Sequence, residues 1–209
     1  MKQLLIFPYN GNGIEALDCL QGQYELIGFV DDNPEKQGIQ ANGVEVFSRA
    51  ALTRYKDAKV LAVPGSPTTY TQRRAMIEGL QVPDNRFATV IHSNAQVSRL
   101  ARIGHNVLIM AGVVITSNAV LGNHLCILPN TVIHHDVQIH DYTLIGAQIV
   151  IAGYTTVGRD CYIGSGSKVI DHITIGDSTL VGMGTNVITS IPARHKVVGN
   201  PARIIGIVS

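Results

Sequence analysis

The chain has 209 residues, of which 45% are hydrophobic, 15% are charged and only 5% are aromatic. Sixteen lysines and arginines almost balance fifteen acidic residues, so no overall charge draws the protein to nucleic acid or to an anionic membrane. The apolar runs are too short to cross a membrane, and Pro8 interrupts the N-terminal run too early for a signal sequence. Cys19, Cys126 and Cys161 form no CxxC pair. We therefore expect a cytoplasmic protein in a reducing compartment, with no membrane insertion and no nucleic-acid partner.

The first 85 residues alternate between strand and helix patterns. Strands are expected at residues 4–7, 25–30, 44–47 and 59–63, and helices at 14–20 and about 68–80. This alternation predicts an α/β domain over residues 1–85 with a small parallel, Rossmann-like sheet. Ligands of such sheets bind at the carboxyl ends of the strands.

Three loops fall at that edge of the predicted sheet. Their candidate ligand-binding residues are Asn10, Gly11, Asn12, Asp31, Asp32 and Gly65. The first loop leads into a helix, where free N–H groups favour an anion such as a phosphate, although it lacks the full G-x-G-x-x-G spacing. The second loop offers carboxylates to a ribose or a base edge, and the third brings bare backbone near the same edge. A solvated Asn-Pro turn and a simple Pro/Gly turn are the alternatives for these two loops.

From Ile91 onward the sequence repeats with a period of six residues. Every sixth residue up to Val187 is Ile, Val or Leu, which makes seventeen consecutive hexads. The residue four places later is small or apolar, and the residue three places later is often Asn, Asp or Gly, which tolerate a positive φ. Three hexads, each a short strand and a turn, make one coil of 18 residues. The pattern predicts a triangular parallel β-solenoid of about five to six coils within residues 86–209.

Motifs from both halves of the chain together resemble one family. They are the Gly/Asn loop, the Asp31-Asp32 pair, the Ile-His-His-Asp-Val run at 133–137 and the Val-Gly-Asn-Pro-Ala-Arg ending at 198–203. Over essentially its whole length the chain is similar to the bacterial nucleotide-sugar N-acetyltransferases of the bacillosamine-pathway type, with sialic acid O-acetyltransferases as relatives. The resemblance implies a left-handed parallel β-helix after the α/β domain. It also implies acetyl transfer from acetyl-CoA to the amine of a UDP-linked 4-amino-4,6-dideoxy sugar in bacterial surface glycan biosynthesis, without a metal, by a homotrimer with active sites between subunits.

The same resemblance implies roles for particular residues. His135 would be the general base, Asp136 would hold its tautomer, and Gly153, 18 residues after His135, would donate its N–H to the thioester carbonyl. Ser165 and Gly182 would contact acetyl-CoA, and the six loop residues named above would contact the nucleotide sugar. No activated nucleophile is evident, so direct attack in a ternary complex is expected rather than an acyl-enzyme.

Four positions depart from the family pattern. Asp136 stands where the family has a glutamate, Pro8 where its first loop opens with glycine, and Asn12 where that loop has a histidine. Leu144 replaces a second histidine near the acyl donor, which predicts a less polar donor site.

Other interpretations of these residues stay open. His135 would otherwise be an exposed turn histidine, and Asp136 is also a natural turn residue at this repeat position. His135 and His140 have the spacing of a gamma-type zinc carbonic anhydrase, but one coil earlier Thr116 and Ser117 offer no third histidine. A non-enzymatic trimeric scaffold or a sugar-nucleotide sensor is a further alternative. Sequence patterns do not separate N- from O-acetylation, or acetyl from another acyl donor.

Overall fold

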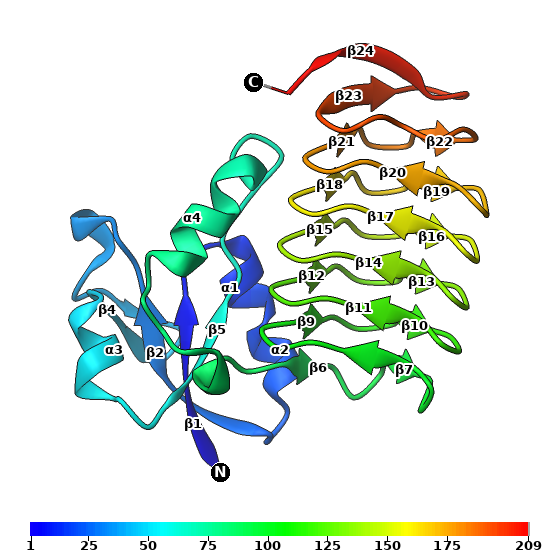
Figure 1. Cartoon of the computed structure of the whole chain (residues 1–209). Helices are drawn as coiled ribbons and strands as arrows, with labels where there is room; N and C mark the ends of the chain where they lie inside the picture. The colour runs from blue at the N-terminus through cyan, green and yellow to red at the C-terminus, as the bar shows by residue number, and fades with distance from the viewer. Residues whose placement is uncertain (209) are drawn as a thin grey trace.

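The computed structural model describes residues 1–208 and has two parts that lie side by side, an α/β domain and a tall stack of coils (Figure 1). The strands of the domain are β1 Lys2–Phe7, β2 Tyr24–Val30, β3 Gln40–Ala41, β4 Val44–Phe47 and β5 Lys59–Ala62. Its helices are α1 Gly11–Glu15, α2 Leu17–Leu20, α3 Ala50–Arg54 and α4 Arg73–Glu78, and its 3₁₀ turns are Pro34–Lys36, Tyr70–Gln72 and Asp84–Arg86. Within this described range, every helix is too short or too polar to cross a membrane.

The sheet of the domain has the order β3-β4-β2-β1-β5 and is mixed. Four strands are parallel, as predicted, but β3 pairs with β4 in the antiparallel sense. The prediction of a wholly parallel sheet is wrong at this edge because Asn42 and Gly43 both adopt a positive φ, 51° and 80°, and close a two-residue hairpin.

The predicted helices also differ in their limits. The first begins earlier than expected, at Gly11, because the Asn10 side chain accepts a hydrogen bond from the Gly13 N–H at 2.8 Å and caps it. The second is α-helical only over α4, since residues 70–72 form a 3₁₀ turn before it. Helix α3 was not predicted.

The second part of the chain consists of seventeen two-residue strands, and each ends at the predicted branched residue. They are β6 Val90–Ile91, β7 Gln96–Val97, β8 Arg102–Ile103, β9 Leu108–Ile109, β10 Val114–Ile115, β11 Val120–Leu121, β12 Cys126–Ile127, β13 Val132–Ile133, β14 Gln138–Ile139, β15 Leu144–Ile145, β16 Val150–Ile151, β17 Thr156–Val157, β18 Tyr162–Ile163, β19 Lys168–Val169, β20 Thr174–Ile175, β21 Leu180–Val181 and β22 Asn186–Val187. Two longer strands close the stack, β23 His195–Val198 and β24 Arg203–Ile207.

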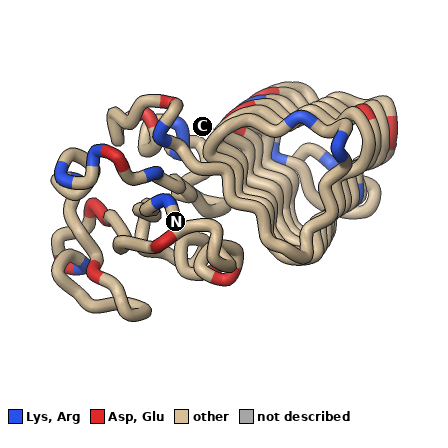
Figure 2. Tube along the Cα trace, turned by 90° about the horizontal axis from the view of Figure 1, so that it is seen from below, with Lys and Arg blue, Asp and Glu red and all other residues tan. Residues whose placement is uncertain are grey.

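These strands form three sheets, which are the three faces of a prism. Sheet I contains β6, β9, β12, β15, β18, β21, β23 and β24; sheet II contains β7, β10, β13, β16, β19 and β22; sheet III contains β8, β11, β14, β17 and β20. Neighbouring strands are parallel and pair residues 18 apart, as Ile115 pairs with Ile133 and Ile133 with Ile151. Seen along the axis, the coils superimpose as a triangle (Figure 2). The predicted β-helix is therefore confirmed, coil length included.

Aliphatic and hydroxyl side chains fill the interior of the prism. Ile115, Ile133 and Ile151 are at most 1% exposed. At the second inward position Thr131 and Thr143 donate to carbonyls fifteen residues further on, at 2.8 and 2.9 Å, so their hydroxyls are satisfied without water. Fourteen consecutive corners, from residue 106 to residue 184, have a positive φ. Each coil therefore turns at the positions where the sequence predicted turns.

The α/β domain packs against sheet I. Outward side chains of this sheet, including Leu108, Cys126 and Leu144, are buried in one cluster with the core of the domain. Arg73 is completely buried and donates to the carbonyls of Pro64 and His124, the latter at 2.8 Å, so it joins a domain loop to a solenoid corner. Because no carboxylate in the described chain pairs with it, burial lowers the pKa of Arg73 to about 10. These contacts hold the two parts in one arrangement.

Candidate active site

His135 lies at the corner between sheets II and III, where the chain turns from β13 to β14. Its Nδ1 is 3.0 Å from Asp136 Oδ2, and the other carboxylate oxygen accepts from Asn118 Nδ2 at 3.2 Å. Asn118 is 18 residues before Asp136, so the two stack in adjacent coils, both with a positive φ. A carboxylate can only accept, so Nδ1 carries the proton and Nε2 keeps its lone pair. The arrangement suits a general base.

Gly153 lies directly beneath this imidazole. A Cβ at Gly153 would be 2.7 Å from His135 Cε1 and 2.9 Å from Nε2, closer than side chains can approach. Gly153 is therefore the only residue type that leaves the ring in place. Its N–H donates to no acceptor within residues 1–208, so it is available to a ligand. The structure thus brings three of the predicted residues, His135, Asp136 and Gly153, into contact.

The predicted loop residues of the α/β domain lie elsewhere, beside sheet I. Asn12 and Gly65 line a cavity of about 180 Å³ between the domain and the solenoid. Its wall is mostly apolar and includes Leu128, Leu144 and Tyr162. Gly65 has a φ of 114°, and a Cβ there would lie 2.9 Å from the Leu144 side chain. Leu144, where the family has a histidine, therefore contributes apolar surface to this cavity.

Asn10 and Asp31 use their side chains within the domain. Asn10 caps α1, and Gly11 beside it is exposed. Asp31 is 5% exposed and accepts from the Tyr9 N–H at 3.1 Å, from the Asn33 N–H at 2.9 Å and from Lys36 Nζ at 3.1 Å. This carboxylate ties the first loop to the second, so its direct effect is on the shape of the loops.

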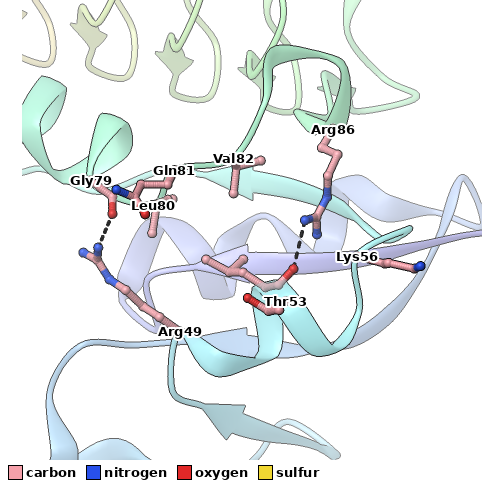
Figure 3. A pocket seen from close by; sticks show the side chains of 9 residues that line it. Arg49, Thr53, Lys56, Gly79, Leu80, Gln81, Val82 and Arg86 are labelled. Atoms are coloured by element: carbon pink, nitrogen blue, oxygen red, sulfur yellow. Dashed lines mark hydrogen bonds between the residues drawn. The ribbon is translucent and has the colours of Figure 1, made fainter.

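Asp32 is exposed and forms a bidentate ion pair with Arg49, at 2.6 and 2.7 Å. Arg49 also donates to the Gly79 carbonyl at the rim of a basic hollow of about 500 Å³ (Figure 3). Arg86, on the same hollow, donates to the carbonyls of Leu52, Tyr55 and Ala58. The fold itself occupies these two guanidinium groups, and none of the predicted site residues lines the hollow.

The two predicted acetyl-CoA contacts lie at the corner between sheets I and II. Ser165 Oγ accepts from the Ala147 N–H at 3.0 Å, next to Gly146, which lines the apolar cavity. Gly182 lies one coil beyond, and a Cβ there would meet Val198 at 2.6 Å. Ser165 and Gly182 therefore share a side of the prism with the cavity.

Within one chain the predicted residues thus form two separate groups. His135, Asp136 and Gly153 lie at the II–III corner, which is opposite sheet I in the triangular section. The domain loops and the acetyl-CoA contacts lie at sheet I and the I–II corner. A site that needs both groups has to be assembled from two chains.

Sequence reasoning missed several neighbours of His135. Asn118 holds Asp136, and the rings of Tyr154 and His172 stack beyond His135 along the same corner. Steps of 18 residues from Asp136 lead to all three, so the coil length was the signal that could have found them. Within residues 1–208, no three His, Cys, Asp or Glu side chains are arranged to hold a metal ion, so one chain offers no complete zinc ligand set.

Comparisons with known proteins agree with this architecture. Residues 100–135 match the bacterial transferase hexapeptide family (six repeats). PerB from Caulobacter crescentus, solved with CoA and GDP-perosamine, is 25% identical; the match covers 99% of this chain and 98% of PerB, with a TM-score of 0.86. The acetyltransferase domain of PglB from Neisseria gonorrhoeae, solved with acetyl-CoA, is 24% identical, with 98% and 99% covered and a TM-score of 0.85. WeeI from Acinetobacter baumannii is also 24% identical, with 98% and 100% covered and a TM-score of 0.84. No curated protein matches the sequence.

The repeat and the whole-length structural match define the chain as a hexapeptide-repeat acyltransferase with an N-terminal α/β domain. Its particular likeness is to perosamine N-acetyltransferase, the enzyme solved with CoA and GDP-perosamine. The predicted resemblance to the nucleotide-sugar N-acetyltransferases is confirmed.

Proposed function

We propose that this protein transfers the acetyl group of acetyl-CoA to the amine of a nucleotide-linked amino sugar, with His135 as the general base. The observation that carries the proposal is the His135–Asp136 pair held over Gly153, because it leaves Nε2 free beside an unpaired N–H. The likeness to PerB, which binds CoA and GDP-perosamine, supports the same class of substrates.

The proposed reaction is a direct attack of the amine on the thioester carbonyl. As the C–N bond forms, the amine loses a proton to His135 Nε2, and Asp136 stabilises the resulting imidazolium. The negative charge that develops on the carbonyl oxygen accepts a hydrogen bond from the Gly153 N–H; such a donor contributes about 2.7 to 4 kcal/mol to transition-state stabilisation. The C–S bond then breaks, and the CoA sulfur takes the proton from the imidazolium. The products are the amide and free CoA thiol.

Replacement of the base tests this mechanism. We expect His135→Ala to lower amino-sugar-dependent CoA release by about 10²- to 10⁴-fold, because a positioned base contributes that much. Acetyl-CoA binding, measured by calorimetry, is expected to stay unchanged. His140→Ala is the matched control, since His140 is also an exposed histidine on the next turn and has no proposed role. Unchanged turnover in His135→Ala would rule out His135 as the base.

The proposed active assembly is a homotrimer with sites between subunits. The separation of His135 from the Asn12–Gly65 cavity across the prism supports it, because one chain cannot supply both groups to one substrate. A closed ring of three chains gives each His135 corner a neighbour's cavity.

A complementation experiment distinguishes this assembly from a site within one chain. His135→Ala and Asn12→Trp chains carry different tags, are co-expressed, and are purified through both tags. In a mixed trimer, one site of three receives an intact His135 from one chain and an intact cavity from the next. We therefore expect about one third of the wild-type activity from two inactive parents. Inactive mixed trimers, or an active monomer in light scattering, would contradict the proposal.

The proposed acceptor is a UDP-linked 4-amino-4,6-dideoxy sugar. The apolar wall of the cavity supports a deoxy sugar, because a hydroxyl placed against Leu128 and Leu144 would lose its hydrogen bonds to water. A panel of UDP- and GDP-linked 4-amino sugars, with C6 as methyl or as hydroxymethyl, tests this class, with sialic acid added to detect O-acetylation. We expect CoA release to be fastest with the UDP-linked 6-deoxy sugar. Faster release with a 6-hydroxy sugar would contradict the assignment of the cavity.

A further inference from the structure

Tyr154 occupies a backbone conformation that does not suit a tyrosine. It lies one coil after Asp136 at the II–III corner and has a φ of 58°. At the two preceding positions of this column, Asn118 and Asp136 adopt the same conformation, which Asn and Asp tolerate better than an aromatic residue. The Tyr154 side chain is also 53% exposed, so core packing does not explain its presence. The residue carries a backbone cost without the usual compensation.

The Tyr154 ring lies between two imidazoles. Its centroid is 5.2 Å from that of His135, with the planes at 82°, which is an edge-to-face contact. On its other side it is 4.8 Å from the ring of His172. His172 is itself held by Asp171, at 2.8 Å from Nδ1 to the carboxylate. The tyrosine ring is therefore supported from the side away from His135.

The His135 ring needs such a contact because burial does not hold it. Its side chain is 51% exposed, and a single hydrogen bond to Asp136 allows the ring to pivot about that bond. Gly153 limits the approach of the ring from one direction only. Tyr154 closes another direction, and the remaining direction is the one into which Nε2 points.

We propose that Tyr154 is a positioning residue, which holds the His135 imidazole in the orientation needed to take a proton from the acceptor amine. The proposal rests on the proposed function and extends it to a residue that neither the motif nor the comparisons assign. A side chain that only stabilised the fold would be expected in a favourable backbone conformation. Here a residue with an unfavourable backbone conformation contacts the proposed base.

Substitution by asparagine separates positioning from stability. In Tyr154→Asn the left-handed backbone becomes easier to adopt, so the melting temperature is expected to rise or stay equal. The value of kcat is expected to fall about tenfold, while KM for both substrates changes less than about twofold, because binding groups are untouched. Tyr154→Phe keeps the ring and is expected to keep kcat within about twofold. Gln148→Asn, at another left-handed and exposed corner, is the matched control and should lose no activity.

An NMR measurement makes the test independent of turnover. The Hε1 resonance of His135, assigned by its absence in His135→Ala, is expected to shift and broaden in Tyr154→Asn but not in Tyr154→Phe. A wild-type kcat and an unchanged resonance in Tyr154→Asn would overturn the proposal. So would a loss in Tyr154→Phe as large as in Tyr154→Asn, since the hydroxyl would then be the active group. If His135→Ala turns over normally, the proposed function fails instead, and the resonance still reports whether Tyr154 orients the ring.

Discussion

Gly153→Ala is the sharpest perturbation of the candidate site, because it adds one methyl group directly under the His135 ring. The added Cβ would lie 2.7 Å from Cε1 and 2.9 Å from Nε2, whereas ordinary contacts begin at 3.4 Å. The ring must therefore withdraw by about 0.7 Å, the difference between 3.4 and 2.7 Å. Gly153 does not have a left-handed φ, so the backbone accepts alanine.

A displacement of this size is large for proton transfer, since misplacement by about 1 Å costs on the order of 100-fold in rate. We expect kcat of Gly153→Ala to fall about 10- to 100-fold although the N–H of residue 153 is retained. Continuous detection of CoA thiol measures the rate, and thermal denaturation checks that the fold is intact.

The double variant with His135→Ala shows whether the effect passes through the ring. Without the imidazole there is nothing for the new methyl group to displace, so the double variant should be no slower than His135→Ala alone. A wild-type rate for Gly153→Ala would refute the close contact. A double variant much slower than His135→Ala would show that Gly153 acts by another route.

Two further predictions concern stability. Burial lowers the pKa of His124 to about 4, below its value of about 6.5 in an unfolded chain, and Nδ1 accepts from Asn106 at 3.0 Å. Because the unfolded chain binds the proton first, the free energy of unfolding should fall as the pH drops from 6.5 to 4, by about 2 kcal/mol after allowance for solvent screening; urea titrations at pH 7 and pH 4.5 measure this, and a flat profile would contradict it. Arg73→Met leaves the carbonyls of Pro64 and His124 buried without their donor, so we expect a loss of about 2 kcal/mol or more in the same assay. An unchanged midpoint would mean that water replaces the guanidinium.

The solenoid was predictable to the residue because its local and tertiary patterns are the same. A strand ends at every sixth residue from Ile91, and the partner of each residue is always 18 places away. The strict repeat therefore defines both the strands and their contacts. Six of the fourteen left-handed corners carry other residues, such as Tyr142 and Gln148, so the repeat dominates over residue preference.

The α/β domain was less predictable because its contacts follow no fixed spacing. Arg73 reaches a carbonyl 51 residues away, and Asp32 pairs with Arg49, 17 residues away; no pattern indicates either contact. The antiparallel edge is different, since Asn42-Gly43 is a typical hairpin turn and was available as a signal.

For the candidate site, the stacking of Gly153 under His135 followed from the coil length. The separation of His135 from Gly65 did not, because it depends on which face of the prism the domain covers. That face was also marked in the sequence. The residues before the hexad positions of sheet I are apolar or aromatic at steps of 18, namely Leu108, Cys126, Leu144, Tyr162 and Leu180. On sheet II the same position includes Gln138's counterparts in register terms, Gln96, Lys168 and Asn186, which remain outside the core.

The 18-residue coil also limits how this protein can change in length. Deleting or duplicating one whole coil moves every later residue along the axis by one strand spacing, about 4.8 Å, and leaves it at the same corner. Adding a single hexad would instead rotate everything after it to the next corner. Upstream of His135, such an insertion would carry the base from the II–III edge to the edge shared with sheet I. Length variants of this chain should therefore tolerate steps of three hexads and lose activity with steps of one or two.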